Sequence, residues 1–199
     1  MAFIAFLGCD GSGKSAVISE IATRCRQDGT EVVVGHWRPR AFRADTAGAK
    51  VPADNPHGER PRGSISSFLK LVWLGFNWWA GWWTGLRKVS RKGLVLFDRY
   101  HGDLLVDPQR YRYGGPLVLA RILTRCMPQP DLVVFLDATP EVLLSRKQEV
   151  SREALETSRE RYLELCRGNS RCAVVDASLP LEEVVAEVFK RISTLSARR

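Results

Sequence analysis

Residues 8–15 constrain this chain more than any other stretch, and they read Gly-Cys-Asp-Gly-Ser-Gly-Lys-Ser. Six apolar residues, 2–7, precede them and predict a buried strand, while apolar residues at helical spacing follow them. Glycines permit a tight turn that brings backbone N–H groups close to an anion, and the start of a helix adds the positive end of its dipole. This pattern between a strand and a helix therefore predicts a phosphate-binding loop.

The polar side chains of this loop have expected roles. Lys14 supplies a mobile positive charge for the outer phosphates of a nucleotide, and the hydroxyl of Ser15 suits a ligand of Mg²⁺. The expected cofactors are ATP and Mg²⁺. The residues expected to contact the nucleotide are Gly8, Cys9, Asp10, Gly11, Ser12, Gly13, Lys14 and Ser15.

Length, charge and cysteine content narrow the class of protein. The 199 residues are enough for one α/β domain with a hydrophobic core, and the net charge of +8 favours an anionic partner. The five cysteines contain no C-x-x-C pair, which predicts free thiols in a reducing cytosol, not disulfides or a zinc site. Residues 1–20 lack the features of a secretory signal. We expect a cytoplasmic protein that binds no specific nucleic acid.

Residues 93–100 predict a strand that ends in charged side chains. The carboxyl ends of parallel strands meet at one edge of a sheet, so Asp98 and Arg99 are expected beside the phosphate loop. A carboxylate there can hold Mg²⁺, directly or through water, or accept a proton from the attacking group. The guanidinium of Arg99 can clamp a phosphoryl oxygen. The alternative is a helix cap with a surface salt bridge.

The long connection over residues 38–64 is rich in proline, glycine and arginine and has no periodicity. It follows a predicted strand over residues 31–37. Its arginines, including Arg38, suit closure over an anionic substrate, and the alternative is a solvated mobile loop. We expect a mobile loop on the acceptor side of the site.

Five of the six tryptophans lie between residues 65 and 86, in a stretch that is apolar around nearly its whole circumference. Lys70 and Asn77 interrupt it, which disfavours a transmembrane helix. A basic run, 87–92, follows it. Three interpretations remain open: a buried central helix, a homodimer face, or a helix on an anionic membrane such as the inner face of a cell membrane.

The second half of the chain predicts the rest of an α/β sheet. Residues 107–116 interleave arginine and aromatic side chains and could line an acceptor pocket. Residues 131–137 and 171–176 read as strands. Basic residues between two helices, over 146–153, suit a short lid that brings cations to a moving phosphoryl group, the alternative being an exposed helical hairpin.

Taken together, these motifs resemble those of the thymidylate kinase family of phosphate-loop nucleotide kinases. Residues 6–15 are similar to that family's F-x-G-x-D-G-x-G-K-[ST], and residues 98–100 to its D-R-[YH]. Residues 130–137 resemble its P-D-L-x-x-x-L-D, and residues 161–165 and 176–184 match its C-terminal end. The resemblance covers both ends and the middle of the chain.

The resemblance implies a single α/β domain over residues 1–199, with helices on both faces of a parallel five-stranded sheet in the order 2-3-1-4-5. It implies that Asp10 contacts an acceptor hydroxyl and that Arg99 grips the acceptor phosphate with help from Arg38. The lid arginines of the family map onto Arg146 and Arg152, and the loop around Ser178 is expected near adenine.

The chain departs from this family at the parts that read the acceptor base. The family's T-R-E-P-G-G-T is replaced by residues 36–40, His-Trp-Arg-Pro-Arg, and the tryptophan stretch replaces the helix with a D-R-x-Q-type element. A site that reads base edges by hydrogen bonds discriminates strongly, so its loss should relax selection. We therefore expect that dTMP is not the best acceptor.

The activity expected is ATP-dependent phosphoryl transfer to dTMP, a related nucleotide or another hydroxyl or phosphorylated acceptor. Catalysis would be positional and electrostatic. Two alternatives stay open: a kinase of a sugar or lipid-linked saccharide, and a nucleotide-dependent, membrane-associated switch without turnover. The residues expected to act in catalysis are Lys14, Asp98, Arg99, Arg146 and Arg152, and those expected to hold the metal are Ser15 and Asp98.

Overall fold

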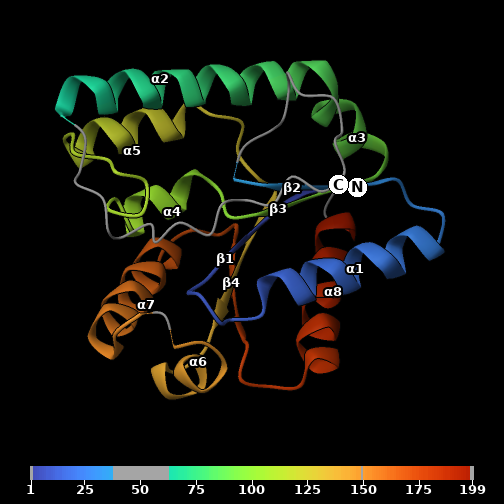
Figure 1. Cartoon of the computed structure of the whole chain (residues 1–199). Helices are drawn as coiled ribbons and strands as arrows, with labels where there is room; N and C mark the ends of the chain where they lie inside the picture. The colour runs from blue at the N-terminus through green and yellow to red at the C-terminus, as the bar shows by residue number, and fades with distance from the viewer. Residues whose placement is uncertain (1, 38–62, 149, 198–199) are drawn as a thin grey trace.

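The computed structural model describes residues 2–37, 63–148 and 150–197, in which strands and helices alternate (Figure 1). The strands are β1 (Ala2–Leu7), β2 (Val32–His36), β3 (Leu94–Asp98), β4 (Leu132–Asp137) and β5 (Cys172–Asp176). The helices are α1 (Lys14–Gln27), α2 (Ser64–Gly81), the π-helical turn η1 (Trp82–Leu86), α3 (Arg87–Lys92), α4 (His101–Val106), α5 (Leu117–Arg125), α6 (Pro140–Arg146), α7 (Arg152–Cys166) and α8 (Leu181–Ala197).

The strands form one five-stranded parallel sheet in the order β2-β3-β1-β4-β5. This order confirms the predicted fold. All six residues of the central strand β1 are buried, whereas the edge strands β2 and β5 carry exposed positions. Continuous burial of a central parallel strand arises because helices cover both faces of the sheet (Figure 1).

The strand register brings the candidate site residues to one edge of the sheet. Phe6 of β1 pairs with Asp98 of β3, and Leu7 pairs with Phe135 of β4. The loops that follow β1, β3 and β4 therefore leave the sheet together, as expected for parallel strands.

Trp78 of α2 anchors the helical layer on the sheet. Its side chain is fully buried, and its ring lies 4.7 Å from Phe97 and 4.4 Å from Tyr100 between centroids. It also stacks on Phe3 of β1 at 5.9 Å. Such aromatic contacts add to the free energy of burying so large a side chain. Part of the tryptophan stretch is therefore core, in agreement with the buried-helix interpretation.

The opposite face of this helix is exposed. Most of the exposed large apolar side chains in the described part of the chain lie on α2, η1 and α5, and we call this set the apolar face. Its members are Ile65, Phe68, Leu69, Val72, Trp73, Phe76, Trp79, Trp83, Leu117, Val118, Leu119 and Ile122. No helix among the described residues is long and apolar enough to span a membrane.

One prediction about the cysteines is wrong. Cys166, at the end of α7, and Cys172, at the start of β5, form a disulfide, with their Cα atoms 5.2 Å apart. A short loop returns the chain from helix to strand and places the two sulfur atoms together. Cys9, Cys25 and Cys126 are free thiols, as predicted.

Candidate functional site

The phosphate loop joins β1 to α1 in the predicted conformation. Gly8, Gly11 and Gly13 all have positive φ, a region in which other residues are strained. A Cβ atom on Gly8 would lie 2.7 Å from the Ser12 Oγ and 2.9 Å from the carbonyl oxygen of Leu136, so a larger residue would displace one of them. Backbone geometry therefore favours glycine at all three positions, and lack of space adds a second reason at Gly8 and Gly11.

Lys14 lies at the first position of α1 with its amino group held inside the loop. The Nζ atom donates hydrogen bonds to the carbonyl oxygens of Gly8 and Cys9, at 2.9 and 2.8 Å, and to the Ser12 Oγ at 3.2 Å. Burial, helped by the charge of nearby Arg99 and opposed by that of Asp98, lowers the pKa of Lys14 to about 8. The amino group is thus positioned before any phosphate is bound.

Asp98 ends β3 with one oxygen paired and one unpaired. Its Oδ2 lies 3.3 Å from Nδ1 of His36, whereas its Oδ1 is buried and has no hydrogen-bond partner among the described residues. Burial raises the pKa of Asp98, but the hydrogen bond to His36 and the charge of Lys14 outweigh it and lower the pKa below its usual value.

This orphaned oxygen fits a metal site. An unpaired buried carboxylate oxygen is costly unless an ion or water satisfies it, and a carboxylate with a serine hydroxyl suits Mg²⁺. Ser15 lines the same cavity as Asp98, of about 790 Å³. The residues present therefore fit the predicted metal. No cluster of three or more metal-binding side chains occurs in the described ranges.

Asp10 lies between two arginines on the other side of the loop. The guanidinium of Arg99 donates to its Oδ1, and that of Arg110 donates to its Oδ2 at 2.6 Å. Burial would raise the pKa of Asp10, but Arg99 and then Arg110 lower it to about 2, so it stays charged. Two cations thus meet at the phosphate loop, on the side expected to take the acceptor.

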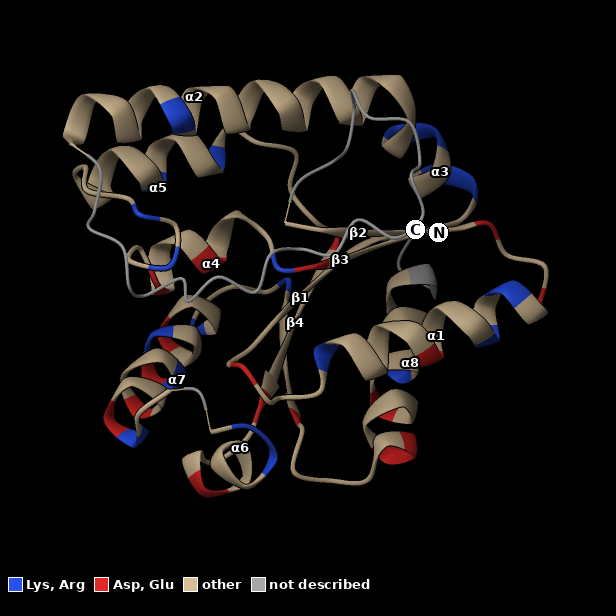
Figure 2. Ribbon diagram, viewed as in Figure 1, with Lys and Arg blue, Asp and Glu red and all other residues tan. Residues whose placement is uncertain are grey.

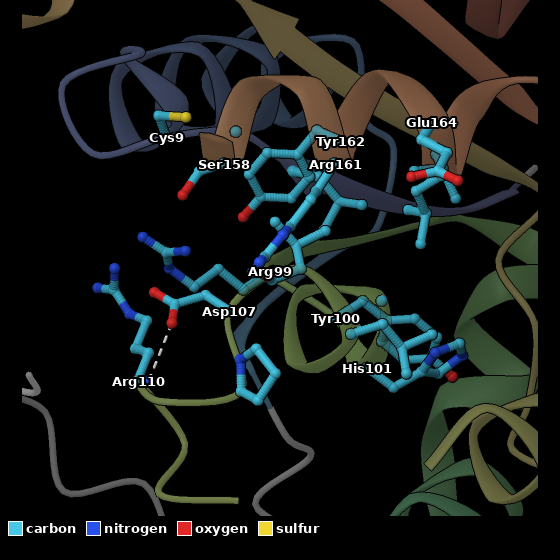
Figure 3. Close-up of a pocket in the computed structure, with 18 of the residues that line it drawn as sticks. Cys9, Arg99, Tyr100, His101, Asp107, Arg110, Ser158, Arg161, Tyr162 and Glu164 are labelled. Atoms are coloured by element: carbon cyan, nitrogen blue, oxygen red, sulfur yellow. Dashed lines mark hydrogen bonds between the residues drawn. The ribbon is translucent and has the colours of Figure 1, made fainter. Parts of the chain in front are cut away.

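A cavity of about 1250 Å³ opens at this point, lined by the loop, α4, the segment around Arg110 and α7. Figure 3 shows the side chains of Arg99 and Arg110 extending toward the same part of the cavity, with Tyr162 nearby. Asp107 fixes the turn by accepting the backbone N–H of Arg110 at 3.1 Å. The cavity is wide enough for a nucleotide, and its cations suit a phosphate.

The two predicted lid arginines are paired with groups outside the phosphate loop. Arg146, at the end of α6, donates to the carbonyl oxygen of Ala177 at 2.8 Å, which places it beside the predicted adenine-side residue Ser178. Arg152 is exposed and pairs with Glu141 and with Glu156. The end of α6 nevertheless approaches the loop, because a Cβ on Gly11 would lie 3.1 Å from the carbonyl oxygen of Leu143.

Sequence reasoning missed two arginines of this site. Arg159 of α7 forms a bidentate pair with Asp137, the last residue of β4, which is the strand beside β1. The Nε of Arg159 donates to Oδ1 at 2.6 Å and its Nη2 donates to Oδ2 at 2.8 Å. Arg110 belongs to the segment 107–116 that was expected to line an acceptor pocket, but nothing singled it out there. Arg159 had one usable signal, since it lies on the helix after the basic lid. Arg38 lies outside the described residues.

Comparisons with known proteins agree with the motifs. The family model described as Thymidylate kinase matches residues 84–188, more than half of the chain. A "Probable thymidylate kinase" of Archaeoglobus fulgidus is 26% identical over 96% of this chain and 94% of its own length. A "Probable thymidylate kinase" of Sulfolobus acidocaldarius is 34% identical over 48% of this chain and 53% of its own length.

Proposed function

Because this chain belongs to the thymidylate kinase family, we propose that it transfers the γ-phosphate of ATP to a nucleoside monophosphate. It is a divergent kinase of that family, and dTMP is the first acceptor to test, since both relatives are named probable thymidylate kinases. The observation that carries the proposal is the meeting of Arg99 and Arg110 at Asp10, beside a formed phosphate loop. In this arrangement the loop would bind the phosphates of ATP, and the two arginines would bind the phosphate of the acceptor beside them.

The donor half of the reaction falls to the phosphate loop. Its backbone N–H groups and Lys14 bind the β- and γ-phosphates, and the buried position of Lys14 strengthens its attraction for them because little water screens it. Ser15 and Asp98 would hold Mg²⁺. That ion, when bound, neutralises charge on the phosphates and orients them.

The acceptor half falls to Asp10, Arg99 and Arg110. An incoming phosphate would replace the carboxylate of Asp10 as the partner of one or both guanidinium groups, leaving Asp10 to contact an acceptor hydroxyl. We propose that Arg38 adds a further cation from the loop that follows β2. The whole chain would act as a single domain.

Residues 146–153 are proposed as the lid. Arg152 is held in solvent by Glu141 and Glu156, and exposed pairs of this kind are weak, so bound nucleotide can attract it away. Arg146 needs only to release the carbonyl oxygen of Ala177. Both cations would then neutralise charge that develops on the transferring group, while Ser178 lies on the adenine side.

Selection among acceptor bases would depend on the residues of a further, smaller pocket. Trp37 stacks on Tyr111, with centroids 3.9 Å apart, and this pair lines a small pocket with Asn77 of α2. The described part of α2 carries no arginine or glutamine that could read a base edge. Stacking selects weakly among bases, which is why the expectation that dTMP is not the best acceptor stands as a prediction.

The test is turnover with ATP, Mg²⁺ and a panel of dTMP, dUMP, dCMP, dGMP and simple sugars, followed by ADP release. We expect turnover with nucleoside monophosphates and little turnover with sugars. Lys14→Ala should lower the rate by about 10³-fold or more without unfolding the chain. Turnover with sugars alone would refute the nucleotide proposal, and undiminished turnover in Lys14→Ala would refute the assigned donor site. A preference for dTMP by about 10⁴-fold would refute the prediction of weak base selection.

The apolar face suits a second copy of this chain. Its central stripe, including Trp73 and Phe76, is aromatic and uncharged, as interface cores are. Basic residues also occur within the helices that carry this face, with Lys70 on α2 and Arg121 and Arg125 on α5, and a further group follows in α3 (Figure 2). If two copies paired with their α2 helices antiparallel, their two α3 segments would lie roughly 30 Å apart. That distance is several Debye lengths at physiological ionic strength, so salt would screen their repulsion.

Sedimentation tests this pairing. We expect a dimer that Phe76→Glu converts to a folded monomer, whereas Leu181→Glu, a matched change at an exposed position of α8, leaves it intact. Flotation with anionic vesicles decides between the two occupants that the sequence left open. A monomer that floats with the vesicles would refute the dimer. The apolar face would then be a membrane-binding surface, and the enzyme would act at a membrane and not free in the cytoplasm.

A further inference from the structure

We infer that Asp103 is a positioning residue that fixes the guanidinium of Arg99 for the acceptor phosphate; this inference rests on the proposed function. Asp103 lies in the first turn of α4, four residues after Arg99, and is fully buried. Its Oδ2 accepts a hydrogen bond from Nη1 of Arg99 at 2.7 Å and another from the hydroxyl of Tyr111 at 2.5 Å. Its Oδ1 accepts a hydrogen bond from the hydroxyl of Tyr162.

The guanidinium of Arg99 is held from two sides. Asp103 accepts a hydrogen bond from its Nη1 group, and Asp10 accepts one from its Nη2 group. The plane of the guanidinium therefore cannot rotate freely. Asp103 is out of reach of an incoming ligand because its side chain has no exposed surface, whereas the side chain of Asp10 is 20% exposed. A phosphate can therefore displace Asp10 while Asp103 keeps Arg99 aimed at the cavity.

The backbone of Arg99 adds a reason for such a clamp. Its φ of 67° is in the left-handed region, which is uncommon for residues other than glycine and persists only where surrounding contacts hold it. Its N–H donates to the carbonyl oxygen of Phe6 at 2.9 Å. The main chain and the side chain of Arg99 are thus both fixed before substrate arrives.

The same carboxylate joins the parts of the site that close on the acceptor. Tyr111 belongs to the acceptor-side segment and stacks on Trp37, and Tyr162 belongs to α7 and stacks on Phe135 of β4. Burial, and then the charge of Asp103, raise the pKa of both tyrosines, so their hydroxyls keep their protons and donate. Charge-assisted hydrogen bonds of this kind are stronger than neutral ones.

Asp103→Asn separates positioning from simple stabilisation. The amide keeps the size of the side chain but removes its charge and turns one acceptor into a donor. Arg99 would then be balanced by Asp10 alone, and Asp10 would compete better with the acceptor. We expect the KM for the nucleoside monophosphate to rise about tenfold or more, while the KM for ATP changes by less than about twofold.

Two further variants keep the test decisive. Tyr111→Phe removes the other donor to the same Oδ2 and should raise the acceptor KM by about two- to fivefold, which provides the answer if Asp103→Asn does not fold. Tyr100→Phe removes a buried hydroxyl that donates to the carbonyl oxygen of Pro128, away from Arg99, and is the matched control. It should lower thermal stability without separating the two KM values.

The outcomes are distinct. A purified wild-type chain that turns over, together with variants in which both KM values rise equally or neither rises, overturns the positioning role and leaves the proposed function intact. A wild-type chain that neither turns over nor binds any nucleoside monophosphate in calorimetry overturns the proposed function and this inference with it. A selective rise in the acceptor KM for Asp103→Asn or Tyr111→Phe, absent in Tyr100→Phe, supports the clamp.

Discussion

Nucleotide binding should take up a proton at Lys14. In the ligand-free chain burial, helped by Arg99, lowers the pKa of Lys14 to about 8, so the amino group is largely charged at pH 7 and largely neutral at pH 9. Phosphates placed against it favour the charged form and raise its pKa again. Binding therefore draws a proton from solution whenever the pH lies above the ligand-free pKa.

The size of the effect follows from that value. At pH 7 about 0.1 of the Lys14 side chains are neutral, and at pH 9 about 0.9 are, so uptake on binding rises from about 0.1 to about 0.9 proton. The sign is that of a lysine whose ligand-free pKa is depressed: affinity is fullest below pH 8 and falls above it. Between pH 7 and pH 9 the dissociation constant for the nucleotide should rise about tenfold.

Calorimetry in two buffers of different ionisation enthalpy measures the uptake directly. Lys14→Met is the control, because it removes the titrating amino group while keeping an unbranched side chain of similar length, and its uptake should not rise between pH 7 and pH 9. Uptake that is flat across this range in the wild-type chain, with unchanged affinity, would refute the buried, depressed state of Lys14.

Three further changes test other parts of the site and core. Asp98→Asn should lower turnover by about 10²-fold or more and weaken the dependence on Mg²⁺, and a normal magnesium titration would contradict the metal assignment. Arg110→Ala should raise the acceptor KM by about tenfold or more and leave the KM for ATP nearly unchanged, because it removes a charged donor on the acceptor side only; equal losses for both substrates would argue against that placement. Trp78→Ala should cost about 3–5 kcal/mol of unfolding free energy, measured by denaturant titration, and a loss below about 1 kcal/mol would contradict its place in the core.

The phosphate loop and the strands were predictable because their signals are local. The loop needs glycines at fixed positions, and buried parallel strands read as continuous apolar runs. The strand order came from the family resemblance, since periodicity alone carries no information about which strands are neighbours. Asp98 and Arg99 were singled out because they lie at the end of a strand, and the carboxyl ends of parallel strands form a binding edge.

The remaining features depend on tertiary contacts. The tryptophan stretch is apolar on all sides, so its sequence cannot say that Trp78 faces the sheet while Trp73 faces solvent. Arg110 joins the site only because its segment meets the phosphate loop at Asp10, and Asp103 only because the turn after β3 brings its carboxylate to the guanidinium of Arg99. The pair Cys166 and Cys172 could not be predicted, because a helix end and a strand start meet through a loop of no recognisable pattern.

The central position of β1 has a mechanical consequence. The phosphate loop begins at the carboxyl end of β1. The carbonyl oxygen of Phe6 in β1 accepts a hydrogen bond from the backbone N–H of Arg99, and the N–H of Phe3 donates one to the carboxylate of Asp131. The phosphate loop and the backbone of Arg99 are thus both tied to β1, which is buried along its whole length. Movement of the outer helices on substrate binding would therefore leave the spacing between the phosphate loop and the backbone of Arg99 nearly unchanged.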